Sequence, residues 1–354
     1  MNRSQAVRAL RGLLAATSRN GALPGGTRCL AEGLGVQHAA APPAVVATRI
    51  QAPGRGFAAA TSDGGGGGGS SDQRNSAWEE VSSLSAAATE MAEEGRPEEA
   101  KALLKRELPG LVEKYGAEDP SVGMVHNQLA LWAFYDGQFA DAVESATAAH
   151  RVWVKELGED SQAAAFHGIR LGMALTADGR PEEAFPLLEK GLDVAVKNYN
   201  THLEQLQALQ PLAEDPAAAA EDASEADQQV MAARAEQQRT SIVMLERLGR
   251  ALQEAKFYRA LSFLGVRGRE LDDKWDDNGA GACFFLEQEM SDAVTDMLRW
   301  VVPDHPTVQA ALREHNRLVG QCRREGLRRV SDDLQIHGQR LADLVEEARN
   351  GKDG

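Results

Sequence analysis

Residues 276–287 hold the side chains whose types and spacing come nearest to a metal site. Part of the spacing of a calcium-binding loop is present, at Asp276, Asn278, Gly281 and Glu287. Ala280 and Phe284, however, stand at positions that would have to supply oxygen ligands. Without those oxygens calcium would bind poorly, so we interpret the segment as an acidic loop between helices and predict no metal site.

A second group of residues that could bind a charged ligand is a run of arginines near the C-terminus. These are Arg313, Arg317, Arg323, Arg324, Arg328 and Arg329. Acidic residues are interspersed with it, at Glu314, Glu325, Asp332 and Asp333. We interpret the run as a helix whose charges are balanced. The alternative is a local contact with an anionic protein or a lipid head group.

The sequence lacks motifs for catalysis or cofactor binding. It contains no glycine-rich dinucleotide or phosphate loop, no His-Glu-x-x-His and no Gly-x-Ser-x-Gly. Carboxylate pairs are frequent, but 53 Asp and Glu residues make most of them solvated helix faces. We therefore predict no enzymatic activity and no cofactor. Cys283 and Cys322 do not have metal-ligand spacing, which favours a reduced compartment.

The elements that position all these residues are predicted to be helices in a repeat. A phrase centred on glycine recurs every 42 residues, at Gly95, Gly137 and Gly179. An alanine follows five positions later each time, at Ala100, Ala142 and Ala184. A fixed period of this size is typical of stacked helix pairs, and 5% aromatic content favours helix over sheet.

The repeat predicts three helix pairs, at 78–94 with 97–115, 121–135 with 139–157, and 161–177 with 181–198. Each glycine stands at the turn inside a pair, where it can take a positive φ at little cost. Each alanine lies one turn into the second helix, where a small side chain allows close approach. Pro109 and Gly110 should kink or shorten the second helix of the first pair.

These glycine and alanine positions, with Ala88, Ala130 and Gly172 in the first helices, resemble the tetratricopeptide repeat. The long period and the segment 116–121 resemble its kinesin-light-chain type. The resemblance implies a superhelical array whose first helices line a concave face. It also implies candidate protein-binding residues on that face, at Asn127, Leu131, Tyr135, Phe166, Arg170 and Met173.

Two of these candidates have specific expected roles. Asn127 would hydrogen-bond the backbone of a bound peptide, and Arg170 would pair with a partner's carboxylate. The alternative is that an inserted acidic helix at 200–240 fills the same groove from within. A grip on a C-terminal carboxylate, as in the chaperone adaptors of the family, is disfavoured because Asn127 alone fits their pattern.

The first 57 residues predict a targeting segment. They contain seven Arg, no Lys and one acidic residue, Glu32, in a chain of net charge −15. An Arg-rich, acid-poor leader is typical of a mitochondrial presequence, and cleavage is expected after Phe57. The alternatives are a disordered tail and a plastid transit peptide. Residues 58–76, with six glycines at 64–69, predict a flexible linker.

The remaining organisation follows from these boundaries. Three helix pairs are predicted at 77–199, and the acidic insertion follows at 200–240. Degenerate pairs and C-terminal capping helices are predicted at 241–348, and a tail at 349–354. A fourth pair is predicted to turn at Ala255, and a final pair to open near His305. The predicted fold class is therefore an all-α helical-hairpin array with a long inserted helix and a C-terminal helical region.

The function we expect is that of a non-catalytic scaffold that binds protein partners. Its location would be the mitochondrial matrix or the matrix side of the inner membrane, and its role the assembly or maintenance of a respiratory-chain complex. One alternative is a permanent subunit of a large complex, such as the ATP synthase or the mitoribosome; another is a plastid adaptor. The acidic net charge argues against nucleic acid, and no apolar run is long enough for a membrane span.

Overall fold

The computed structural model describes residues 71–94, 96–208, 225–299 and 301–350. These residues belong to two compact units, the larger with 71–208 and 244–350 and the smaller with 225–243. Helices make up nearly all of the described residues, and no strand occurs among them. The predicted all-α fold class is confirmed. The predictions for residues 1–70, for Gly95, and for 209–224 within the insertion lie outside the described residues.

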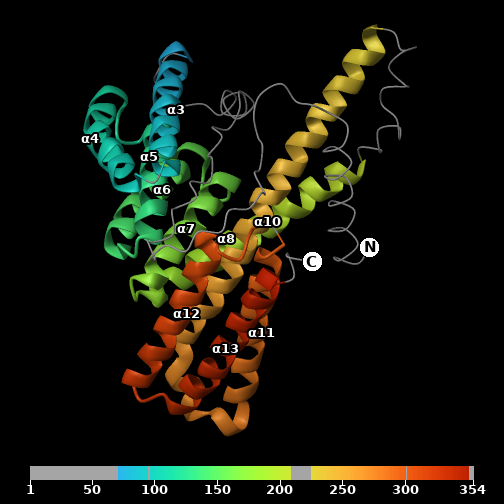
Figure 1. The fold of residues 1–354 in the computed structure, drawn as a ribbon. Helices are drawn as coiled ribbons and strands as arrows, with labels where there is room; N and C mark the ends of the chain where they lie inside the picture. The colour runs from blue at the N-terminus through green and yellow to red at the C-terminus, as the bar shows by residue number, and fades with distance from the viewer. Residues whose placement is uncertain (1–70, 95, 209–224, 300, 351–354) are drawn as a thin grey trace. The chain divides into compact units, whose positions relative to one another are not determined.

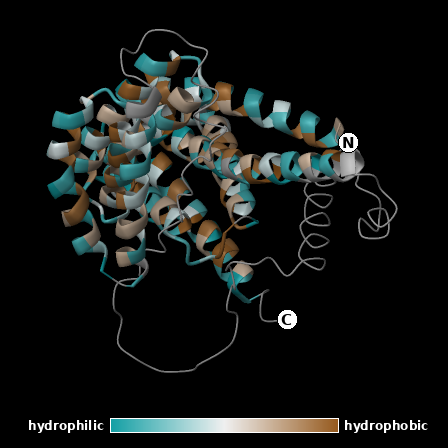
Figure 2. Cartoon of the chain, turned by 90° about the horizontal axis from the view of Figure 1, so that it is seen from above, coloured by the Kyte–Doolittle hydropathy of each residue, from teal (hydrophilic) through white to brown (hydrophobic). Residues whose placement is uncertain are grey.

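Three helix pairs follow one another in the larger unit, and consecutive helices pack side by side (Figure 1). They are α3 (Ser71–Glu93) with α4 (Pro97–Tyr115), α5 (Pro120–Tyr135) with α6 (Phe139–Leu157), and α7 (Gln162–Ala177) with α8 (Pro181–Ala208). Hydrophobic and hydrophilic residues are interspersed along the helices (Figure 2), as expected of helices that bury one face. Of the expectation that Pro109 and Gly110 kink or shorten the second helix, the shortening is wrong, because α4 continues to Tyr115 around buried Leu104 and Leu111.

The turns inside the pairs share one hydrogen-bonded geometry. Gly137 and Gly179 have φ of 76° and 81°, and the next residue donates its N–H to a carbonyl five positions back. Gly326 has the same bond pattern and a φ of 78°. It joins α12 (Pro306–Arg324) to α13 (Arg328–Asn350), so these two helices form a further hairpin of the same kind.

Small side chains let the helices of each pair approach closely. Ala100, Ala142 and Ala184 are completely buried. A Cβ on Gly172 would lie 2.6 Å from Cγ of Leu188. The close contact between α7 and α8 therefore depends on the absence of a side chain at this position.

Between the array and the final hairpin runs α10 (Glu225–Asp273), a single helix through Ala255. The predicted turn at Ala255 is therefore wrong. Buried Leu248, Ala251, Leu252, Ala255, Tyr258 and Leu261 continue one apolar face past this point, and the helix passes through Gly249 without a break. After α10 come a π-helical turn (Trp275–Gly279) and α11 (Ala280–Met297).

The helices α11, α12 and α13 lie beside the C-terminal part of α10 (Figure 1). Arg259 of α10 binds Glu289 of α11 at 2.6 Å, and a Cβ on Gly268 would lie 3.3 Å from Leu327. No helix in the described part of the chain is apolar and long enough for a membrane crossing.

The segment interpreted as an acidic loop is helical. Asp276 and Asn278 lie in the π-helical turn, and Gly281 and Glu287 lie in α11. The loop interpretation is wrong because Gly279 allows the chain to continue directly from the turn into α11. Glu287 instead enters the core, with its side chain hydrogen-bonded to Asp333.

Candidate functional site: the concave face of helices α5 and α7

The first helices of the second and third pairs, α5 and α7, are in contact and carry the predicted binding residues. Arg170 of α7 donates a hydrogen bond of 2.6 Å to Oδ1 of Asn127 of α5. The same guanidinium lies 4.4 Å from the ring centroid of Phe166. These three side chains therefore form one cluster, in which the ring and the amide together orient the arginine.

Burial of this cluster lowers the pKa of Arg170. Desolvation lowers the pKa of the guanidinium, Glu254 of α10 opposes that shift, and Arg250 adds to it. Arg170 and Phe166 are half-buried, whereas Asn127 is buried. The cluster is thus a partly desolvated cationic site with an aromatic side.

Tyr135, at the end of α5, connects the array to the later helices. Its hydroxyl lies 2.9 Å from Oγ1 of Thr307, which donates to Glu254 at 3.1 Å. Because the Thr307 proton goes to the carboxylate, Tyr135 is the donor to Thr307. Burial raises the pKa of Tyr135 to about 12, and Glu254 adds to the shift. This chain of hydrogen bonds joins α5, α12 and α10.

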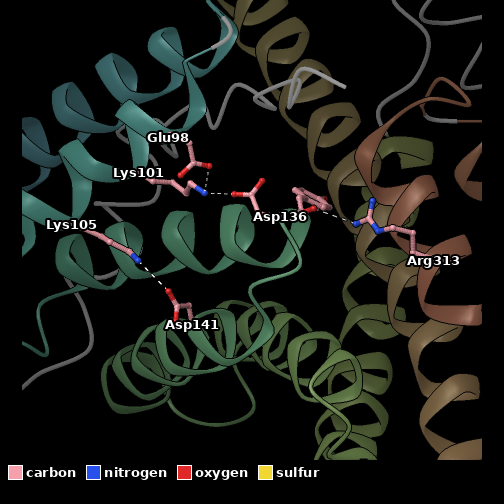
Figure 3. Close-up of polar contacts among 7 residues, drawn as sticks. Glu98, Lys101, Lys105, Asp136, Asp141 and Arg313 are labelled. Carbon is pink, nitrogen blue, oxygen red and sulfur yellow. Dashed lines mark hydrogen bonds and ion pairs between the residues drawn. The ribbon is translucent and has the colours of Figure 1, made fainter. Parts of the chain in front are cut away.

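Two arginines of α12 bind the C-terminal ends of α5 and α7, the first helices of the second and third pairs. Arg313 donates to the carbonyl oxygen of Tyr135 at 3.3 Å (Figure 3), and Arg317 donates to that of Thr176 at 2.6 Å. Carbonyls at a helix C-terminus lack partners within the helix and carry partial negative charge. These arginines therefore serve as caps for α5 and α7.

The arginine run is otherwise divided among local contacts. Arg317 also binds Glu314 at 2.7 Å, Arg329 binds Asp276 at 3.0 Å, and Arg323 donates to Gln335. Of the four interspersed acids, Glu314 is the one that pairs with an arginine of the run in the ion pairs found between described residues, so charge balance by the other three stays a prediction. The capping role had no signal in the sequence, because it depends on helices distant along the chain.

The C-terminal part of α10 covers the same ends of α5 and α7. Thr176 and Ser262 hydroxyls lie 2.6 Å apart, and the rings of Phe134 and Tyr258 are 5.8 Å apart between centroids. This part of the concave face is therefore covered from within the chain. The covering residues come from α10 beyond 244 and from α12.

The remaining predicted binding residues differ in exposure. Leu131 is half-buried, but Met173 is 4% exposed and belongs to the core that also contains Leu261 and Met290. The expectation that Met173 is available to a partner is wrong, because later helices cover that part of α7. The binding roles of Asn127, Leu131, Tyr135, Phe166 and Arg170 stay predictions.

A charge contact missed in the sequence joins the first and second pairs. Lys101 of α4 binds both Glu98 and Asp136, and Lys105 binds Asp141 at 3.1 Å (Figure 3). Burial alone would lower the pKa of Lys101, but its hydrogen bonds with the two carboxylates outweigh burial and raise it. The contact fixes α4 against the turn between α5 and α6.

No group of three or more His, Cys, Asp and Glu side chains that could hold a metal ion is found among the described residues. Residues 121–195, from α5 into α8, match the family model described as Tetratricopeptide repeat. A search of curated proteins found no significant match. The family match supports a tetratricopeptide-repeat array in this part of the chain, and such repeats are typically protein-binding scaffolds without catalytic activity.

Proposed function

We propose that this protein is a non-catalytic mitochondrial scaffold with tetratricopeptide repeats of the kinesin-light-chain type. It binds protein partners through the concave face of α5 and α7, and it serves in the assembly or maintenance of a respiratory-chain complex. Its action is binding alone, because the cluster presents a cation, an aromatic ring and an amide without a nucleophile or a paired acid and base.

The observation that supports partner binding most strongly is the cluster of Arg170, Phe166 and Asn127. Internal helices cover the C-terminal ends of α5 and α7, but Arg170 and Phe166 stay partly exposed further along the same face. Arginine and aromatic side chains are enriched among the residues that contribute most to protein interfaces. The cluster is therefore the place where a partner can still reach the concave face.

Mitochondrial location is supported by the arginine-rich, acid-poor composition of residues 1–57. We expect isolated mitochondria to import the radiolabelled full chain in a potential-dependent reaction and to cut it after Phe57. N-terminal sequencing of the imported product should then begin at Ala58. Import by chloroplasts with no import by mitochondria would contradict this prediction and support the plastid alternative.

Partner capture tests the binding role. We expect the wild-type chain, immobilised and exposed to gently solubilised mitochondria, to retain specific proteins, and the Asn127→Ala, Arg170→Ala double variant to retain at least about tenfold less. Arg151→Ala is the matched control, since Arg151 is an exposed arginine on a second helix of the array. Circular dichroism melts of all three proteins show whether the fold is intact.

Equal capture by the wild type and the double variant would overturn the concave-face assignment. Native gels of the captured material distinguish the two roles within mitochondria. An assembly factor migrates with intermediates in small amounts, whereas a permanent subunit migrates with the finished complex in fixed stoichiometry.

A further inference from the structure

The three most exposed large hydrophobic side chains in the described part of the chain lie outside the repeat array. They are Phe285, Phe284 and Ile336, which are 75, 57 and 57% exposed. The phenylalanines belong to α11 and Ile336 belongs to α13. The two rings contact each other edge to face, with 6.2 Å between their centroids. Exposed apolar area of this kind marks an interaction surface when it is contiguous and has a polar rim.

The two helices that carry these side chains lie side by side (Figure 1). Glu287 of α11 shares a hydrogen bond with Asp333 of α13. One turn later in both helices, Ser291 lies 2.9 Å from His337. The helices therefore run in the same direction. Ile336 directly precedes His337, and both phenylalanines lie within one turn of Glu287, so the three exposed side chains belong to one outward surface.

Carboxylates without a cationic partner form the rim of this surface. Asp292 follows the phenylalanines by two turns and accepts a hydrogen bond from the neutral amide of Gln288 at 3.0 Å. On α13, exposed Asp332 and Asp343 lie one turn before and two turns after Ile336. The ion pairs that α11 and α13 form in the described part of the chain involve other side chains.

The cations nearest to this surface act on other groups, and α11 itself contains no Lys or Arg. Arg259 of α10 binds Glu289 at 2.6 Å, and Arg329 binds Asp276 at 3.0 Å. The charge of Arg340 acts on buried Glu287. The outward surface of α11 and α13 therefore combines apolar side chains with an excess of negative charge.

This combination determines which occupant fits. Two adjacent helices can receive the side-chain ridges of a third helix, and cations beside the apolar face of that helix would lie near the carboxylates. A second copy would bring like charges together, because the chain has a net charge of −15. An anionic lipid surface would be repelled for the same reason.

We propose that Phe284, Phe285 and Ile336 form a docking surface for an amphipathic helix of a partner protein, with Lys or Arg beside its apolar face. This surface lies outside residues 121–195, which match the repeat family. It goes beyond the proposed binding to the concave face and is independent of it.

Fluorescence anisotropy with the full chain and a labelled peptide of about 18 residues, whose Leu and Lys form an amphipathic helix, measures this binding. Two control peptides separate the contributions. One has Glu in place of Lys, and the other has the same composition with Leu spread around the helix. We expect both to bind at least about tenfold more weakly than the first peptide. Equal binding of all three peptides would overturn the proposal.

Variants locate the binding. The Phe284→Gln, Phe285→Gln double variant should bind the Leu–Lys peptide at least about tenfold more weakly, and the Asp292→Asn, Asp332→Asn double variant about threefold more weakly. Val302→Gln is the control, since Val302 is 55% exposed but lies beyond the end of α11. Melting temperatures within about 2 °C of the wild type are expected, because the replaced side chains are exposed. Equal binding by all these proteins would contradict the assignment.

Crosslinking on the wild type needs no variant. A benzophenone-bearing Leu–Lys peptide should attach within 281–292 or 332–343, and attachment elsewhere would overturn the proposal. Sedimentation of the wild type alone should show a monomer. A dimer that the phenylalanine variant dissociates, or binding to anionic lipid vesicles that the same variant loses, would replace the proposed occupant by a second copy or a membrane.

One further variant keeps this test separate from the proposed function. The Asn127→Ala, Arg170→Ala variant of the concave face should bind the Leu–Lys peptide as the wild type does. If that variant loses captured partners while no protein binds the peptide, the concave-face role stands and the docking surface fails. The reverse pattern would support the docking surface and remove the concave-face role.

Discussion

Gly279→Ala is expected to destabilise the protein by about 3 kcal/mol or more. A Cβ at Gly279 would lie 2.0 Å from the carbonyl oxygen of Leu271 and 3.1 Å from the carbonyl carbon of Lys274. Both are backbone atoms, so no side-chain rotation relieves the contact. The substitution would force apart the π-helical turn that joins α10 to α11.

The reason for this tight contact is the geometry of the turn. The N–H groups of Asn278 and Gly279 both donate to the carbonyl of Lys274, at 3.0 and 2.8 Å. The extra residue in a π-helical turn brings the following backbone against the preceding turn. The φ of Gly279 is −63°, an ordinary helical value, so lack of space rather than positive φ makes glycine necessary here.

Gly281→Ala is the matched control, two residues further along the same segment. A Cβ there meets nothing within 4 Å, and alanine is a better helix former than glycine. We expect this control to be neutral or to stabilise by about 0.5–1 kcal/mol. Urea unfolding followed by circular dichroism measures both variants. Equal midpoints for Gly279→Ala and Gly281→Ala would show that the turn is placed wrongly.

Glu287→Gln is expected to stabilise the protein, and the gain should grow with pH. Glu287 is 5% exposed and shares a hydrogen bond with Asp333 of α13. Burial, followed by repulsion from Asp333, raises the pKa of Glu287 well above the ordinary 4.5, while Arg340 opposes the shift. The folded protein therefore keeps a proton on Glu287 in a pH range where the unfolded chain has lost it.

The sign of the pH effect follows from that difference. Because the pKa of Glu287 is raised in the folded state, its contribution to the free energy of unfolding is fully present below about pH 4.5. That contribution falls as the pH rises toward the pKa of Glu287 in the folded protein. Glutamine keeps a hydrogen-bond donor for Asp333 and does not titrate. The difference between variant and wild type should thus be small at pH 4.5 and reach about 2 kcal/mol by pH 8.

The buried histidines nearby do not obscure this measurement. Ser291 and His315 flank His337 at 2.9 and 3.0 Å. Burial lowers the pKa of His315 to about 3 and that of His337 to about 4. Both rings are neutral in the folded state over the relevant range. Their effect on acid stability is the same in the variant and the wild type, so it cancels in the difference.

Asp292→Asn serves as the control for Glu287→Gln, because Asp292 is an exposed carboxylate on the same helix. Its stability difference from the wild type should not change between pH 5 and pH 8. Unfolding in urea at four pH values gives the comparison. A difference for Glu287→Gln that stays constant or shrinks as pH rises would contradict the assignment of a shared proton to this pair.

The sequence by itself determined the array of hairpins. Helix pairs need a turn residue that tolerates positive φ and a small residue where the helices meet, and both recur locally, as at Gly137 with Ala142 and Gly179 with Ala184. The same signal could have found the last hairpin. Gly326 is followed five positions later by buried Ser331, a small residue in the place of alanine.

The tertiary structure alone decided what covers the concave face and which side chains meet there. Ala255 lies within the continuous helix α10 because the apolar face of α10 is buried both before and after Ala255. A local sequence pattern does not reveal this burial. Arg170 looks like an ordinary solvated arginine in the sequence. It becomes unusual only where the fold places it against Asn127 and Phe166, since side-chain contacts depend on distance in space rather than along the chain.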